Sequence, residues 1–71
     1  MIYAINAIWD AEAEVWIAQS DDVPGLILES GSLDALIERL KFAIPEMLEL
    51  NGKKSDQFAF CFRSERQVIY G

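Results

Sequence analysis

Two apolar runs in the first twenty residues predict a pair of β-strands. Residues 2–9, IYAINAIW, and residues 14–20, EVWIAQS, are rich in side chains that favour strands. Residues 10–13, DAEA, lie between them and suit a hairpin connection slightly longer than the tightest type. Both runs carry apolar residues at odd and at even positions, so we expect each strand to be apolar on both faces.

The following stretch, SDDVPGL, predicts a chain reversal. Asp21 and Asp22 end the second strand, because aspartate favours turns over strands. Pro24 fixes φ and Gly25 accepts a positive φ, so the two residues together form the turn. Residues 26–29 then form a third, short strand. Three consecutive strands with short connections favour an antiparallel meander.

A helical pattern of apolar residues begins after this third strand. Ser32 is the expected N-cap, and Asp34 lies in the first turn, where a negative charge meets the helix dipole. The apolar residues at helical spacing are Leu33, Leu36, Ile37, Leu40, Ile44, Met47 and Leu48. The pattern keeps its phase through Pro45, which predicts either one helix kinked near residues 43–45 or two abutting helical pieces. Asn51-Gly52 forms the C-cap.

The last apolar segment, residues 57–63 (QFAFCFR), alternates strictly and predicts another strand, with its three phenylalanines on one side. Residues 64–66 are expected to form a bulge or a turn. Residues 67–70 either extend this strand or start a separate fifth one.

The predicted fold class is therefore α+β, with the element order β-β-β-α-β. It comprises a three-stranded antiparallel meander, one kinked helix on one sheet face and an added fourth strand, which the helical crossover places parallel to the first. One helix covers only one sheet face. An apolar face, including Trp9 or Trp16, is therefore left uncovered. We expect this face to mediate self-association, as a dimer, and binding of a different protein is the alternative.

Composition places these elements in a single domain, residues 1–71. Apolar residues make up 52% of the chain, too many for a disordered acidic tail. The single cysteine forms no internal disulfide, which fits a reducing compartment. The first residues lack the features of a signal peptide, and no apolar run approaches the roughly 20 residues that span a bilayer. We expect a cytoplasmic protein that does not contact membranes.

Charge is unevenly distributed along the chain, whose net charge is −6. The first basic residue is Arg39, and only acidic residues carry charge before it. Such a surface disfavours direct contact with nucleic acid and attracts a basic protein. The candidate partner-binding residues are Asp10, Glu12, Asp21, Asp22 and Glu29. The alternative is that these acids only keep a small apolar domain in solution.

The residue types present exclude several kinds of chemistry. The sequence has no histidine, which excludes histidine-dependent acid–base catalysis, Ser-His-Asp triads and histidine metal sites. Cys61 lies within an apolar strand pattern and is expected to be a buried structural thiol. One alternative is a divalent-metal site formed by Asp10, Asp21, Asp22 and Glu29. Because strand-end acids are common turn residues, we predict instead a non-enzymatic protein without a cofactor.

One sequence pattern points to a family. An acid precedes Val-Pro-Gly-Leu, and after a short strand a hydroxyl residue and Leu-Asp begin a helix. In this chain the pattern consists of Asp22, Val23, Pro24, Gly25, Leu26, Ser32, Leu33 and Asp34. It resembles the HicB family of antitoxins. Trp9-Asp10, Val15-Trp16-Ile17-Ala18 and Ser20 indicate a short HicB-like family of uncharacterised bacterial proteins, and the resemblance covers about residues 2–52.

The resemblance implies a partial ribonuclease-H-like fold in a protein that oligomerises. It also implies neutralisation, by direct binding, of a small basic RNA-cleaving toxin of the HicA type. Family members usually carry a C-terminal DNA-binding region, which has no counterpart within residues 1–71. A second hypothesis is a stand-alone regulatory or ligand-binding domain that homodimerises and has no toxin partner. A metal-dependent nuclease remnant is the third.

Overall fold

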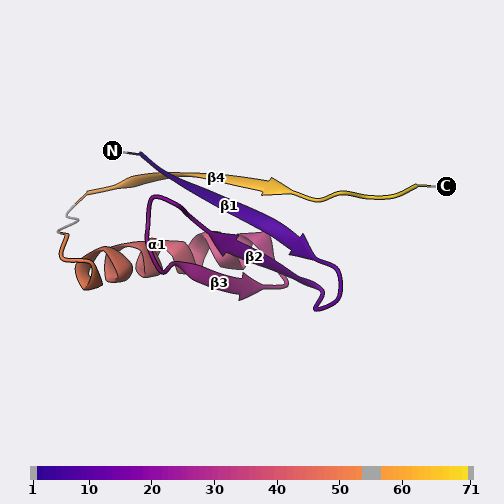
Figure 1. The fold of residues 1–71 in the computed structure, drawn as a ribbon, viewed down its shortest axis with the longest axis horizontal. Helices are drawn as coiled ribbons and strands as arrows, with labels where there is room; N and C mark the ends of the chain where they lie inside the picture. Colours follow the sequence, from indigo (N-terminus) through magenta and orange to yellow (C-terminus); the bar gives the residue numbers. More distant parts are fainter. Residues whose placement is uncertain (1, 54–56, 71) are drawn as a thin grey trace.

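The described residues form four strands and one helix in the order predicted from the sequence (Figure 1). The computed structural model describes residues 2–53 and 57–70. Its elements are β1 (Ile2–Asp10), β2 (Val15–Gln19), β3 (Ile27–Ser30), α1 (Leu33–Leu50) and β4 (Ala59–Glu65). The molecule is elongated, with principal extents of 49, 20 and 19 Å, because the residues after β4 continue beyond the other elements (Figure 1).

The four strands form one mixed sheet in the order β3-β2-β1-β4. This corrects the predicted fold class, a three-stranded antiparallel meander with a kinked helix and an added strand. Strand β2 is antiparallel to both β1 and β3, whereas β4 is parallel to β1. The β4–β1 register runs from Ala59–Ile2 to Glu65–Ile8, which is longer than the β1–β2 register. Because β4 pairs with its free side, β1 is an interior strand. The predicted parallel pairing of the last strand with the first is confirmed.

Helix α1 runs without interruption from Leu33 to Leu50, although Pro45 lies inside it. The alternative of two helical pieces is therefore wrong. Ser32 is the N-cap as predicted, and its side-chain oxygen accepts a hydrogen bond from the Ala35 amide at 3.3 Å. At the other end the Lys53 amide donates to the Leu48 carbonyl at 2.8 Å, which satisfies one of the last free carbonyls of the helix.

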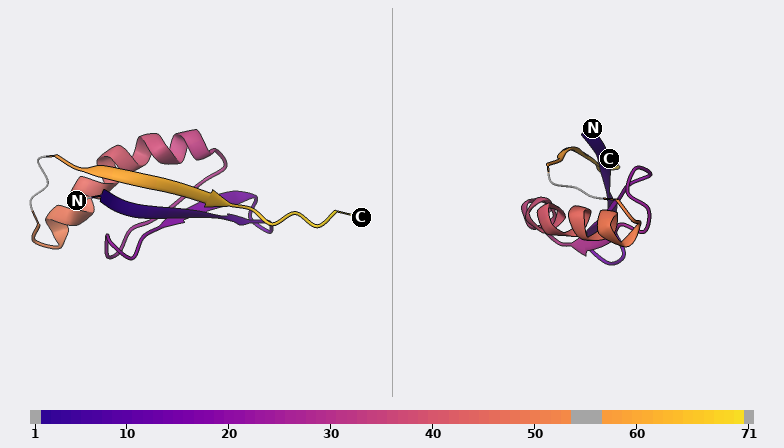
Figure 2. Two further views of the ribbon diagram at one scale, coloured as in Figure 1. Left: turned by 90° about the horizontal axis from the view of Figure 1, so that it is seen from above. Right: turned by 90° about the vertical axis from the view of Figure 1, so that its left-hand side faces the viewer.

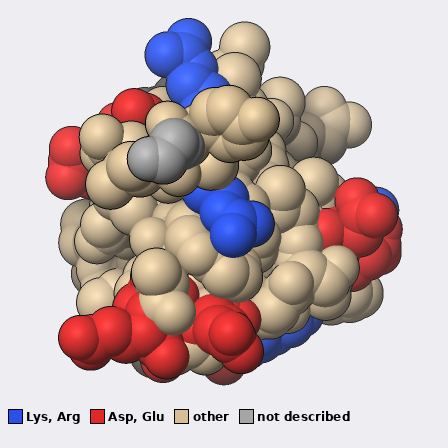
Figure 3. Space-filling view, turned by 90° about the vertical axis from the view of Figure 1, so that its right-hand side faces the viewer, with Lys and Arg blue, Asp and Glu red and all other residues tan. Residues whose placement is uncertain are grey.

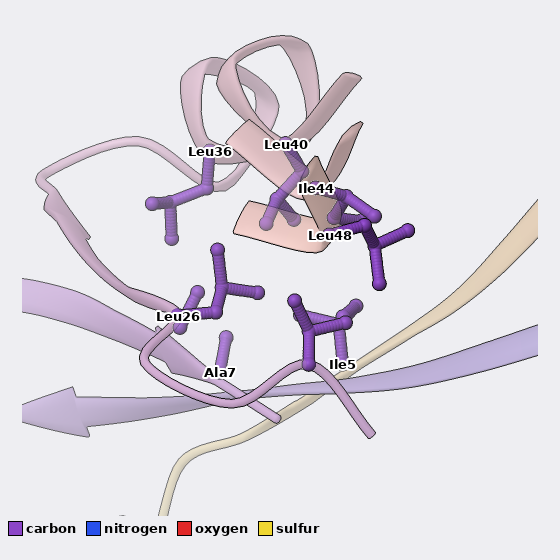
Figure 4. Close-up of a cluster of buried hydrophobic side chains, with 9 residues drawn as sticks. Ile5, Ala7, Leu26, Leu36, Leu40, Ile44 and Leu48 are labelled. Carbon is purple, nitrogen blue, oxygen red and sulfur yellow. The ribbon is translucent and has the colours of Figure 1, made fainter. Parts of the chain in front are cut away.

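The core lies between α1 and one face of the sheet. The helix contributes a stripe of four residues, all with 0% exposure: Leu36, Leu40, Ile44 and Leu48. They face Ile5, Ala7 and Leu26 (Figure 4), and Ala18 and Val23 belong to the same buried cluster. Figure 2 shows that the helix lies along only one side of the strands. The spacing of four residues along α1 explains the buried stripe. The opposite face of the sheet is bare because the described residues form one helix, which lies on the other side.

The turn before β3 is built as its sequence predicts. The Leu26 amide donates to the Val23 carbonyl at 3.2 Å, and Gly25 has a φ of +83°, which together define a type II turn with Pro24 at its second position. The side chain of Asn51 holds this turn against the end of the helix by donating to the Pro24 carbonyl at 3.1 Å. The turn therefore fixes where β3 begins relative to α1.

The end of β4 differs from the prediction. Ser64 and Glu65 belong to the strand, so the bulge or turn expected at residues 64–66 is wrong. Residues 66–70 have no strand assignment, so they form neither a continuation of β4 nor a fifth strand. They continue past the end of β1 (Figure 1).

We expect Gly25→Val to lower the free energy of unfolding by about 2 kcal/mol, because an L side chain at positive φ costs roughly 1–2 kcal/mol. The new Cβ would also lie 2.7 Å from the Met47 Cε atom. Urea denaturation followed by circular dichroism measures the change.

Two other glycines are matched controls for this prediction. Gly52 has a φ of +76°, and a Cβ added there would meet no other atom within 4 Å, so Gly52→Ala should cost only the backbone strain, about 1 kcal/mol. Gly31 has neither constraint, and Gly31→Ala should stay within about 0.5 kcal/mol of the parent. Equal losses in all three variants would contradict this explanation of the turn.

Candidate interaction surface on the helix-free sheet face

The face of the sheet opposite α1 carries exposed isoleucines on β1 and β3. Paired residues point to the same face of a sheet, so the strand registers define this surface. Its central members are Ile2, Ala4, Asn6, Ile8, Ile17, Gln19, Ile27, Glu29, Cys61 and Arg63. Ile2, Ile8 and Ile27 are 67%, 51% and 65% exposed. The uncovered apolar face predicted from the sequence is therefore present, and we call it the helix-free face.

A shallow depression of about 850 Å³ crosses this face and touches all four strands or their adjoining loops. Ile8 and Ile27 supply apolar surface, Asn6 and Gln19 supply amides, and Asp21 lies at the rim. Arg63 and Glu65 of β4 also line the depression. The surface therefore combines exposed apolar area with polar groups of both charges, as protein-binding surfaces do.

Neither tryptophan lies on the helix-free face, contrary to the prediction. Trp9 and Trp16 are register partners, with ring centroids 5.3 Å apart in an edge-to-face arrangement. Both lie on the helix side of the sheet, where Trp16 packs against the core. The sequence could not reveal this, because the pairing depends on the length of the hairpin. Isoleucines are the residues that the sequence reasoning missed, and their even spacing along β1 was the available signal.

Two of the predicted acidic residues lie in the β1–β2 hairpin. The Asp10 Oδ1 atom accepts hydrogen bonds from the amides of Glu12 and Ala13 at 3.1 and 3.3 Å. Glu12 is exposed within the turn. Asp10 therefore stabilises the hairpin turn through its own carboxylate, whereas the Glu12 side chain makes no hydrogen bond or ion pair with another described residue.

Asp22 has a structural role that the sequence did not indicate. Its Oδ2 atom accepts a hydrogen bond from the Ala4 amide at 2.8 Å. The Ser20 hydroxyl donates to the Ala4 carbonyl at 2.6 Å and accepts from the Asp22 amide at 3.0 Å. Strand β2 ends at Gln19, so these two side chains replace it as the hydrogen-bonding partner of β1. Asp21, its neighbour, is exposed.

The candidate acids do not form one cluster. The hairpin residues and the Asp21-Asp22 pair lie at opposite ends of β2, and Glu29 projects from β3 next to Ile17. Arg39 approaches this strand and donates from Nη1 to the Glu29 carbonyl at 2.7 Å. Within residues 2–53 and 57–70 no group of three or more metal-binding side chains occurs, so the proposed divalent-metal set is not assembled.

The charge asymmetry of the sequence is only partly preserved in space. Seen from the hairpin end, acidic side chains gather in separate patches, with basic side chains between them (Figure 3). Strand β4 explains this mixture, because it places Arg63 next to Asn6 and leads Arg66 to within 4.2 Å of the Trp9 ring centroid. The acidic residues before α1 lie in and beside the hairpin, in the loop after β2 and on β3, rather than on one continuous surface.

Cys61 is exposed, which contradicts the expectation of a buried thiol. Its neighbours Phe60 and Phe62 pack against the core, so alternation along β4 turns Cys61 to the helix-free face. The alternating pattern around Cys61 correctly predicts a strand. It does not show which side of that strand the helix covers.

These features define a small α+β domain that exposes one apolar sheet face. Within the described part of the chain, no helix is both long and apolar enough to cross a membrane. Residues 2–70 match the model of the family described as Domain of unknown function (DUF1902), and the chain belongs to this family.

One solved structure shares this fold closely. It is the crystal structure of the hypothetical protein TTHA1013 from the extremely thermophilic bacterium Thermus thermophilus, with a TM-score of 0.84 and 37% sequence identity. The match covers 99% of this chain and 100% of the other. No curated protein shows significant similarity to the chain.

We expect Asp22→Ala to lower the free energy of unfolding by about 1–2 kcal/mol, because the Ala4 amide loses a charged acceptor. Asp21→Ala is the matched control and should change stability by less than about 0.5 kcal/mol. Thermal denaturation of the two variants measures the difference. A fully stable Asp22→Ala protein would show that the contact contributes nothing to the fold.

Proposed function

We propose that this protein is a non-enzymatic, HicB-like interaction module that neutralises a small basic RNA-cleaving toxin of the HicA type by direct binding. The observation that carries the proposal is the helix-free face, where three isoleucines are more than half exposed beside acidic groups. Surfaces of this kind on a small domain are commonly binding sites.

The apolar and acidic parts of the surface have different roles in this proposal. Ile8 and Ile27 provide the affinity, since burying such a side chain contributes roughly 1.5–3 kcal/mol. Asp21 and Glu29 border or share the same face and are exposed. Their charges accelerate the approach of a basic partner and select against acidic ones. Glu12, in the hairpin, adds a further negative charge to those of Asp21 and Glu29.

The proposal uses the five candidate acids unequally. Asp10 and Asp22 each hold backbone amides, so their carboxylates are partly committed to the fold. Glu12, Asp21 and Glu29 make no side-chain hydrogen bond or ion pair among the described residues. We therefore propose that these three acids contact the partner. Binding of a toxin that acts on cellular RNA would place the protein in the cytoplasm.

The depression of about 850 Å³ favours a second candidate function, a stand-alone regulatory or ligand-binding domain that homodimerises and has no toxin partner. Its volume lies in the range of small-molecule sites, roughly 300–1,000 Å³. It is shallow, however, whereas small-molecule sites bury most of their ligand. The toxin-binding proposal therefore agrees better with the shape of the surface.

We expect Ile8→Lys combined with Ile27→Lys to weaken binding of a catalytically inactive HicA-type toxin at least about 100-fold, because two apolar contacts are lost and two positive charges are added. Calorimetric titration at two salt concentrations measures the affinity.

Phe42→Lys is the matched control, because Phe42 is 75% exposed on the helix rather than on the helix-free face. It should change the affinity by less than about 3-fold, since it lies outside the proposed contact. Equal loss in the control, or unchanged binding by the double variant, would contradict the assignment of this face. Absence of binding to any toxin of this type would favour the stand-alone function.

A further inference from the structure

The sheet has two edges, and they are protected to different degrees. Strand β3 is only four residues long and is bounded by the Pro24-Gly25 turn and by Gly31. Strand β4 is seven residues long and contains no proline, no lysine and no positive-φ residue. Short strands, charged side chains, prolines and bulges are the usual devices that prevent an edge from pairing with another chain. Of these, strand β4 has only two charged residues of opposite sign, Arg63 and Glu65.

Three exposed apolar residues follow β4 in direct succession. Val68, Ile69 and Tyr70 are 71%, 92% and 99% exposed, and all three residue types favour strands. The segment continues beyond the end of β1 (Figures 1 and 2). Arg66 lies over the Trp9 ring. Trp9 and Arg66 are the residues that come next after the last register pair, Ile8 and Glu65. The segment is thus aligned with the sheet but has no neighbouring strand at its apolar end.

We propose that residues 58–70 pair antiparallel with the same residues of a second copy of this chain, centred on Ser64. In a two-fold symmetric pair of edge strands, the residue at the axis faces its own copy. Centring on Ser64 places Arg63 opposite Glu65 of the other copy, and the reverse pair forms by symmetry. It also places Val68, Ile69 and Tyr70 opposite Phe60, Ala59 and Phe58 of the other copy.

Charge selects this register over its neighbours. Centring the pair on Arg63, Glu65 or Arg66 would place each of these residues opposite its own copy, and directly opposed like charges destabilise a sheet. Centring on Phe62 would place Glu65 opposite Ala59 and leave Val68 and Ile69 without apolar partners. Only the Ser64 register pairs opposite charges and covers the three exposed apolar residues together.

Face alternation gives independent support to this arrangement. Phe58 and Phe60 are half-buried, stack with ring centroids 6.2 Å apart and pack against the core. The partner's even-numbered Val68 and Tyr70 would lie on the same side of the sheet and extend this aromatic row. The two helices would then cover one side of an eight-stranded sheet. The helix-free face of each copy would stay open, so this inference does not depend on the proposed function.

A cysteine scan tests the register directly. In a Cys61→Ser background, Ser64→Cys should form an intermolecular disulfide under mild oxidation, because opposed Cα atoms lie about 4.5–5.5 Å apart. Arg63→Cys and Glu65→Cys are the controls. Each would lie about 8 Å from its own copy, beyond the reach of a disulfide, so little dimer should form on a non-reducing gel. Efficient crosslinking in a control, with none at position 64, would overturn the register.

A charge exchange tests the pairing without cysteines. Sedimentation equilibrium of the parent protein should show a monomer–dimer equilibrium. Arg63→Glu should raise the dimer dissociation constant roughly ten-fold or more, because two attractive pairs become repulsive. Arg63→Glu combined with Glu65→Arg should restore it. A parent that stays monomeric at millimolar concentration would overturn the proposal. So would a dimer that is insensitive to Arg63→Glu and is dissociated by Ile8→Lys, since that result would place the interface on the helix-free face.

Discussion

One helix packed on one face of a four-stranded sheet is the constraint on which the rest of this structure depends. The stripe formed by Leu36, Leu40, Ile44 and Leu48 is fully buried and faces the sheet. A helix of 18 residues is about 27 Å long, enough to run along the strands. A single helix covers only the face on which it packs. Every apolar residue on the opposite face is therefore left in contact with solvent unless another molecule covers it.

Strand β1 links this constraint to the two proposed surfaces. It is interior to the sheet, with β2 on one side and β4 on the other. Where β2 ends, Ser20 and Asp22 take over its role and form hydrogen bonds to the Ala4 carbonyl and amide, so pairing on this side of β1 extends to Ala4. This pairing fixes the positions of the exposed Ile2 and Ile8 on the helix-free face. It also leaves β4 at the edge of the sheet, so the proposed partner-binding face and the proposed self-association edge are separate surfaces.

Local features of this fold were predictable from the sequence, whereas long-range pairings were not. The Ser32 cap, the helix through Pro45 and the Pro24-Gly25 turn each follow from residues within one or two turns of chain. The contact of Asp22 with Ala4 joins residues 18 positions apart and depends on where β2 ends. The positions of the two tryptophans and of Cys61 depend on strand register and on which face the helix covers. Neither is encoded in a local pattern.

The candidate site illustrates the same distinction. Counting faces correctly predicted an uncovered apolar surface, because this argument needs only the number of helices. Choosing its residues required the register, which replaced tryptophans with isoleucines and gave Asp22 a structural role. The anionic half of the sequence became a mixed surface because β4 returns next to β1 and carries Arg63 with it. Charge summed along a chain therefore overstates charge separation in a sheet whose last strand pairs with its first.

Isoleucine-methyl NMR would test the central claim, that the helix-free face binds a basic protein, most directly. Isoleucines lie on both sides of the sheet, so one labelled sample reports on the core and on the surface together. Addition of a catalytically inactive HicA-type toxin should shift the methyl signals of Ile8, Ile17 and Ile27, while those of the fully buried Ile5 and Ile44 change little. The claim would be contradicted if the complex formed and only the methyl signal of Ile37, on the helix, shifted. It would also be contradicted if the complex formed and the methyl signals of Ile8, Ile17 and Ile27 did not shift.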